Sequence, residues 1–208
     1  MTKYFDIESR RTNDPAVIAR LQASVQPPGN ISKAETLAAW WKDKAPAAQL
    51  AAVEQTSLDG TYGRLASFAW AYDDSIVRCV YGDDELGMLH GAHDFFANNP
   101  SLLVAFNGEF DLRFLKQRMI INRIPVPTAI NVALSKRDAY FDPMHEWAGF
   151  RGYVKQVELE RVFGIEREDS ITGADVGTAI DCGDWAAIER HNIADVTNLR
   201  EIYKRITA

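Results

Sequence analysis

The 208-residue sequence has few cysteines and no long apolar segment, and both features narrow the class of protein. Cys79 and Cys182 are the only cysteines, too few for a disulfide scaffold or a thiolate zinc site. No apolar run approaches the roughly 18 residues of a transmembrane helix. Residues 1–15 are too charged for the apolar part of a signal peptide. We therefore expect a globular cytoplasmic protein with free thiols and no membrane partner.

The net charge of −6 does not favour a nucleic-acid partner, but the charge is unevenly distributed. Residues 1–111 carry a net charge of −6, residues 112–155 carry +5 and residues 156–208 carry −5. The basic middle segment is a candidate surface for contact with a phosphate backbone. Within it, Tyr153 and Lys155 are the better candidates, because the glycine before Tyr153 allows a backbone to approach closely.

The hydrophobic pattern predicts an α/β fold, with a mixed sheet flanked by helices. Four β-type runs predict strands, the middle two forming an antiparallel hairpin and the last buried on both faces: residues 3–8, 65–72, 75–81 and 102–106. Helical spacing covers residues 84–96, 110–119, 154–163 and 184–206. We expect a single domain over residues 1–208, in which residues 10–56 form a helical insertion lying against the same domain.

Four acids and one histidine occupy positions where chemistry is possible. Asp6 and Glu8 alternate along the first strand, so both project from one face. Asp111 follows the buried strand at a helix start, where α/β folds place ligands. His191 and Asp195 lie four residues apart, on one face of the last helix. Individually these residues have plainer explanations, namely a solvated strand end, a first-turn acid and a surface histidine.

The order and context of these residues resemble the DEDD superfamily of 3′–5′ exonucleases, which has a ribonuclease H-like fold. Phe5-Asp6-Ile7-Glu8-Ser9 matches the family's Asp-x-Glu, and Asn107-Gly108-Glu109-Phe110-Asp111 matches its Asn-x-x-Phe-Asp. The terminal acid matches Asp195, although His191 takes the place of the tyrosine in the subgroup with Tyr-x-x-x-Asp. Gly173-Ala174-Asp175-Val176 is similar to the segment before the final helix in exonucleases like those of B-family DNA polymerases. Nearly the whole chain takes part in this resemblance, including softer matches to phage-type members.

The resemblance implies a metal centre, with two Mg²⁺ or Mn²⁺ ions held by Asp6, Glu8, Asp111 and Asp195. His191 would orient or deprotonate the attacking water. Substrate contacts would come from five residues: Ser9, Asn107, Phe110, Tyr153 and Lys155.

The activity implied is hydrolysis of single-stranded DNA from its 3′ end, with release of nucleoside 5′-monophosphates. Two alternatives stay open. One is a 3′–5′ exoribonuclease, because no motif in the sequence indicates whether the protein binds or excludes the 2′-hydroxyl that distinguishes RNA from DNA. The other is a catalytically weak nucleic-acid-binding accessory module, because a fold can serve as a scaffold without its chemistry. The sequence does not identify a partner in replication or repair.

Overall fold

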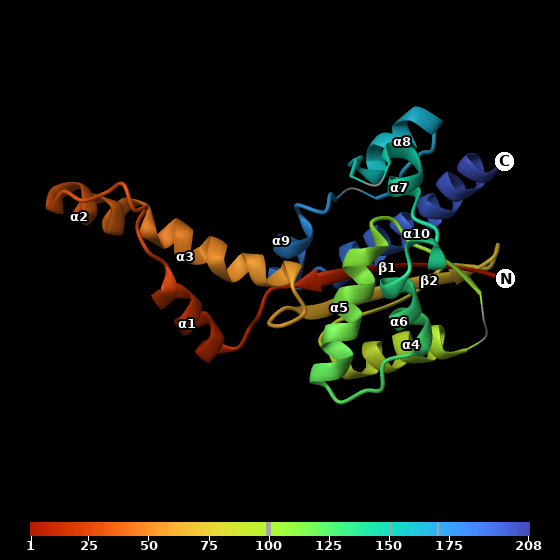
Figure 1. The fold of residues 1–208 in the computed structure, drawn as a ribbon, viewed down its shortest axis with the longest axis horizontal. Coiled ribbons are helices and arrows are strands. Elements are labelled where there is room, and N and C mark those ends of the chain that lie inside the picture. Colours follow the sequence, from red (N-terminus) through yellow and green to blue (C-terminus); the bar gives the residue numbers. More distant parts are fainter. Residues whose placement is uncertain (99–100, 150, 170) are drawn as a thin grey trace. The chain divides into compact units, whose positions relative to one another are not determined.

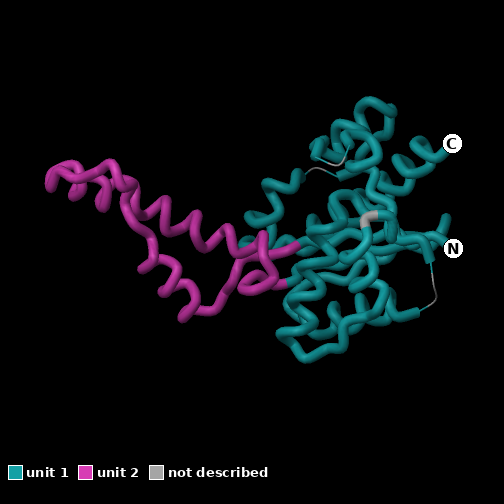
Figure 2. Tube along the Cα trace, viewed as in Figure 1, with its two compact units in different colours: residues 1–8, 65–208 teal, residues 9–64 magenta. Residues whose placement is uncertain are grey.

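The computed structural model describes residues 1–98, 101–149, 151–169 and 171–208. Contacts along the chain divide it into two compact units, residues 1–8 with 65–208 (unit 1) and residues 9–64 (unit 2), coloured separately in Figure 2. Unit 2 closely matches the predicted insertion, and its packing against the rest of the domain stays a prediction. In the described part of the chain, no helix combines the length and the apolar character needed to cross a membrane.

In the described residues the sheet has four strands, in the order β3-β2-β1-β4. Figure 1 labels β1 and β2, the two central strands. Their bounds are β1 Thr2–Arg10, β2 Arg64–Tyr72, β3 Arg78–Tyr81 and β4 Leu102–Val104. β1 and β4 run parallel, while β2 and β3 form the predicted antiparallel pair. The mixed sheet flanked by helices confirms the predicted α/β class.

The fourth strand differs from the prediction for residues 102–106. β4 ends at Val104, the last residue that pairs with β1, and its other edge makes a parallel bridge with Phe141, in which the Ala105 amide donates to the Phe141 carbonyl at 3.2 Å. Leu102 is 40% exposed, whereas Leu103 and Val104 are buried. The strand is therefore buried at its carboxyl end, which leads toward Asp111, and exposed at its first residue, Leu102.

Helices cover both faces of the sheet. One face packs on α4 (Glu85–Ala97), α5 (Gly108–Ile121) and α6 (Thr128–Ser135), and the other packs on α10 (Trp185–Thr207) (Figure 1). Along β1, Phe5 and Ile7 enter the first core, while Tyr4 packs with the α10 residues. Because side chains alternate along a strand, Asp6 and Glu8 share the α10 face with Tyr4.

Shorter elements complete unit 1: η2 Arg137–Ala139, α7 Pro143–Ala148, α8 Gln156–Phe163 and α9 Val176–Asp181. The helices predicted over 84–96, 110–119, 154–163 and 184–206 are confirmed as α4, α5, α8 and α10. Cys79 and Cys182 are free thiols. Burial raises the pKa of Cys79 to about 12, so this thiol resists ionisation.

Unit 2 consists of α1 Pro15–Ser24, α2 Ala34–Asp43, α3 Ala45–Glu54 and η1 Gln55–Leu58. α1 begins at a proline, after Asp14 accepts a hydrogen bond from the Ala16 amide at 2.8 Å. Neither α1 nor α2 contains a buried residue, and α3 buries only Ala45 and Val53. Unit 2 is helical, as predicted. Its helices α1 to α3 bury few apolar side chains.

Candidate metal centre

The carboxylate of Asp6 is held from the opposite helix. Asn192 of α10 donates from Nδ2 to Asp6 Oδ2 at 2.5 Å, and its own Oδ1 accepts from the Ser67 hydroxyl at 2.9 Å. Asn192 is completely buried, so its amide orientation is fixed by these two bonds. This bond joins Asp6 of β1 to Asn192 of α10, although the two residues are 186 positions apart in the sequence.

Asp111 reaches the strand from the first turn of α5. Its Oδ1 accepts from the Ile7 amide at 3.0 Å, between the two acids of β1. α5 starts after Asn107, whose backbone is left-handed with φ of 53°. Asp142 fixes this turn by accepting from the Asn107 amide at 3.0 Å and the Gly108 amide at 3.2 Å.

Gly108 is required for this turn because the chain is crowded there. A Cβ at this position would lie 2.7 Å from Ala105 Cβ and 2.9 Å from the ring of Tyr140. Any side chain would push α5 away from the sheet, and Asp111 would lose its position.

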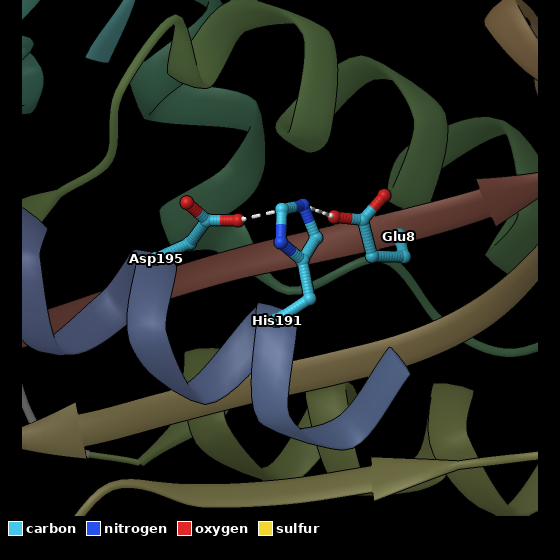
Figure 3. A group of neighbouring side chains, drawn as sticks. All are labelled: Glu8, His191 and Asp195. Atoms are coloured by element: carbon cyan, nitrogen blue, oxygen red, sulfur yellow. Dashed lines mark ion pairs between the residues drawn. The ribbon is translucent and has the colours of Figure 1, made fainter. Parts of the chain in front are cut away.

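His191 lies between two of the acids (Figure 3). Its Nε2 is 3.5 Å from Glu8 Oε1 and 3.4 Å from Asp195 Oδ2. One ligand atom from each of the three residues lies within 4.8 Å of the others, which is close enough for a shared cation. β1 and α10 therefore bring Glu8, His191 and Asp195 together, and the roles of these residues in metal binding and catalysis stay predictions.

Arg167 and Asp169 are charged residues that contact Asp195 and His191 of the acidic cluster. Arg167, in the irregular segment after α8, donates from Nη2 to Asp195 Oδ1 at 2.6 Å and to Glu160 Oε1 at 2.7 Å. Asp169 of the same segment accepts from Arg167 Nη1 at 3.2 Å and pairs with His191 Nδ1. Burial lowers the pKa of Arg167, but the bonds to Glu160 and Asp195 outweigh burial and raise it, so this guanidinium stays charged.

The acids repel one another in a buried setting. Burial raises the pKa of Asp6 and Glu8 well above their ordinary values, and the charges of Asp111 and Asp195 raise both further. Burial raises the pKa of Asp111 to about 8. Burial also raises the pKa of Asp195, although the nearby cationic groups oppose it. In the described part of the chain, His191 and Arg167 oppose these shifts without cancelling them, so the site favours an additional cation.

The donors suit a divalent cation. Carboxylate oxygens are hard ligands, and the imidazole of His191 adds a nitrogen donor beside them. Asp6, Glu8, Asp111 and Asp195 would hold such an ion. Burial and, to a smaller extent, mutual repulsion raise the pKa values of these acids, and a bound cation would stabilise their charged forms against both.

A cavity of about 520 Å³ opens beside these residues. It is lined by Asp6, Glu8, His191 and Asp195, by Arg167, and by residues of the segments around Lys155 and Gly173. Gln156 in this wall donates to the Asp195 carbonyl at 3.0 Å. Of the described residues in the basic segment 112–155, Lys155 alone is among those that line this cavity.

The predicted substrate contacts are found in different settings. Lys155 lines the cavity, and Tyr153, two residues before it, is 72% exposed. Asn107 is exposed at the start of α5, while Phe110 is half-buried against the core with its ring 5.9 Å from Phe114. Ser9 belongs to unit 2, where its hydroxyl donates to the Ser57 carbonyl at 2.6 Å.

Sequence reasoning missed Asn192, Arg167 and Asp169. Asn192 could have been considered, because it neighbours His191 on the final helix. Arg167 and Asp169 lie in an irregular segment, where no periodicity indicates which side chains point inward. The only sequence signal for them is an unusual density of charge between residues 166 and 169.

Comparisons with known proteins agree with this architecture. A family model of the RNase_H superfamily matches residues 51–207. Among solved structures, the chain is similar to the family B DNA polymerase from the hyperthermophilic archaeon Pyrobaculum calidifontis, with a TM-score of 0.60 and 13% identity. The similarity covers 99% of this chain and 24% of the polymerase chain, so this chain spans about a quarter of that protein's length. A comparison with curated protein sequences finds no match.

The family match and the structural similarity confirm the predicted ribonuclease H-like fold and support a nuclease-type activity. The family match extends over most of the chain, including β2, β4, α5 and α10, the elements that assemble around β1. The chain belongs to the RNase_H superfamily.

Proposed function

We propose that this protein is a metal-dependent 3′–5′ exonuclease that acts on single-stranded DNA. The observation that carries the proposal is the convergence of Asp6, Glu8 and Asp195 in the wall of one cavity, with Asp111 bonded to the Ile7 amide between the two acids of β1. These largely buried carboxylates also raise one another's pKa values. These four residues come from β1, α5 and α10 and would hold two Mg²⁺ or Mn²⁺ ions. When bound, such ions lower the pKa of a water molecule and offset the charge on a departing oxygen.

The residues of the chain have distinct parts in this reaction. His191 Nε2 faces Glu8 and Asp195, so it is placed to orient the attacking water or to accept its proton. Lys155 lies in the wall of the same cavity, where an ammonium group can contact the strand's phosphates. The exposed ring of Tyr153 is available for stacking on a base. Asn107 and Phe110 at the start of α5 are further proposed contacts within unit 1. Ser9, which follows Glu8 in the sequence, is proposed as a contact from the sequence motif alone.

DNA is the favoured substrate because the similar solved structure is a DNA polymerase. The basic segment 112–155, with its net charge of +5, supplies the backbone contacts that the whole-chain charge of −6 obscures. An exoribonuclease would use the same centre, and the test below separates the two substrates.

Single-stranded DNA and RNA oligonucleotides of one sequence, each labelled at the 5′ or the 3′ end, would test the proposal with Mn²⁺ or Mg²⁺. We expect the 3′ label to leave first as a mononucleotide and the 5′-labelled DNA to shorten stepwise. Chelator should stop both. Faster shortening of the RNA would assign an exoribonuclease, and intact 3′ ends on every substrate would contradict the proposal and favour a binding module.

A further inference from the structure

Asp169 is buried beside the proposed centre but is not one of its four acids. Its side chain is 2% exposed, and it lies in the segment between α8 and α9. Both of its oxygens are engaged, since Oδ2 pairs with His191 Nδ1 and Oδ1 accepts from Arg167 Nη1 at 3.2 Å. With both oxygens committed, the carboxylate has a fixed orientation.

This contact determines where the proton of the imidazole is found. A carboxylate oxygen only accepts hydrogen bonds, so the hydrogen between Asp169 and His191 is carried by Nδ1. In a neutral ring, the Nδ1 hydrogen leaves a lone pair on Nε2. Nε2 is 3.5 Å from Glu8 and 3.4 Å from Asp195, longer than an N–H···O hydrogen bond. Nε2 therefore faces the acids without being committed to either.

We propose that Asp169 is a positioning residue that holds His191 as its Nδ1–H tautomer and aims the Nε2 lone pair at the metal centre. The inference rests on the proposed function, in which that lone pair serves the attacking water. Asp169 would touch neither water nor substrate and would act through His191 alone. Carboxylates that orient histidines in this way affect activity by about 10–100-fold.

The competing role is purely structural, with Asp169 serving to anchor Arg167. Arg167 already has shorter bonds to Glu160, at 2.7 and 2.9 Å, and to Asp195, at 2.6 Å. The bond to Asp169 is its longest, at 3.2 Å. The segment therefore stays attached to α8 and α10 without Asp169, which favours the role toward His191.

Two variants separate the roles. Asp169→Asn keeps an acceptor for His191 Nδ1–H but removes the charge facing Arg167, whereas Asp169→Ala removes both. The first readout is the His191 tautomer, measured by ¹⁵N NMR on metal-free protein at alkaline pH, with His191→Ala to assign the signals. We expect the Nδ1–H form in the wild type and Asp169→Asn, and a shift toward Nε2–H in Asp169→Ala.

The second readout is the single-turnover cleavage rate with saturating DNA and Mn²⁺. We expect Asp169→Ala to lose about 10–100-fold and Asp169→Asn to stay within about 3-fold of the wild type. In a His191→Ala background, Asp169→Ala should cause no further loss, because it acts through the missing ring.

Three results would overturn the inference. They are an unchanged tautomer in Asp169→Ala, an Asp169→Asn rate as low as that of Asp169→Ala, or a further loss in the His191→Ala background. If the wild type cleaved nothing, the proposed function would fail, and the NMR measurement would still decide whether Asp169 sets the tautomer.

Discussion

The carboxylate of Asp111 accepts a hydrogen bond from the backbone amide of Ile7, the residue between Asp6 and Glu8. An acid on α5 is therefore tied to the strand that carries two other acids, at a distance of 3.0 Å. The donor is the main-chain amide of Ile7, so this bond does not depend on the side chains of β1. The position of Asp111 relative to β1 is therefore set by the backbone, whereas the proposed metal binding depends on the acidic side chains.

Asp6→Ala should abolish cleavage and leave the fold intact. The substitution removes one proposed metal ligand and relieves repulsion among the remaining acids. A lost ligand costs several kcal/mol of transition-state stabilisation, so we expect a rate lower by at least about 100-fold. Labelled-oligonucleotide cleavage and circular dichroism measure the two effects. Glu109→Gln, an exposed acid on α5, is the control, and full activity in Asp6→Ala would contradict the metal assignment.

The metal-free protein should lose stability as the pH rises from about 4 to about 8. Asp111 has a pKa of about 8 in the folded protein, above its ordinary value, so the folded state binds more protons than the unfolded state across this range. Each such proton lowers the free energy of unfolding by up to about 1.4 kcal/mol per pH unit. Urea unfolding in chelator at several pH values measures the slope.

Asp111→Asn tests the origin of this slope, because asparagine can still accept from the Ile7 amide but does not ionise. In Asp111→Asn we expect the free energy of unfolding to change less with pH than it does in the wild type. In Glu109→Gln we expect the same pH dependence as in the wild type. A wild-type protein that became more stable between pH 4 and pH 8 without metal would refute the raised pKa values.

Tyr153→Ala should weaken binding of single-stranded DNA without destabilising the protein. The ring is 72% exposed, so its removal costs little packing, while stacking on one base contributes about 1–3 kcal/mol. Fluorescence anisotropy with a labelled oligonucleotide should show the dissociation constant rising about 5- to 150-fold. Tyr153→Phe keeps the ring and should bind as the wild type does. Equal affinity in both variants would exclude a stacking role.

Glu85→Ala should destabilise the fold strongly. Glu85 Oε2 accepts from Arg118 Nη2 at 2.8 Å and Oε1 accepts from the Leu65 amide at 2.8 Å, all in a buried setting. Removing the acid takes away the carboxylate that pairs with the buried Arg118 guanidinium, at a cost of about 3–5 kcal/mol.

Urea unfolding compares this variant with Glu158→Ala, which breaks the exposed Glu158–Arg161 pair. The exposed pair should contribute less than about 1 kcal/mol. Similar losses in both variants would show that burial does not set the strength of the Glu85 interaction.

The parts of the site that could be predicted are those governed by periodicity. Alternation along β1 placed Asp6 and Glu8 on one face, and helical spacing placed His191 and Asp195 together. β4 was predicted too long, because its length is set by its pairing with β1, which ends at Val104, and the apolar run itself does not show where that pairing ends. α6, α7 and α9, of 8, 6 and 6 residues, are too short for a clear helical repeat.

The contact between Asn192 and Asp6 also bears on how the molecule is made. These residues are separated by 186 positions, so loop closure must bring distant parts of the chain together before the acids can assemble. Contacts of such high sequence separation slow the folding of a domain. During synthesis, a chain that still lacked α10 would lack Asp195 and His191, so the proposed centre could assemble only after this helix is made.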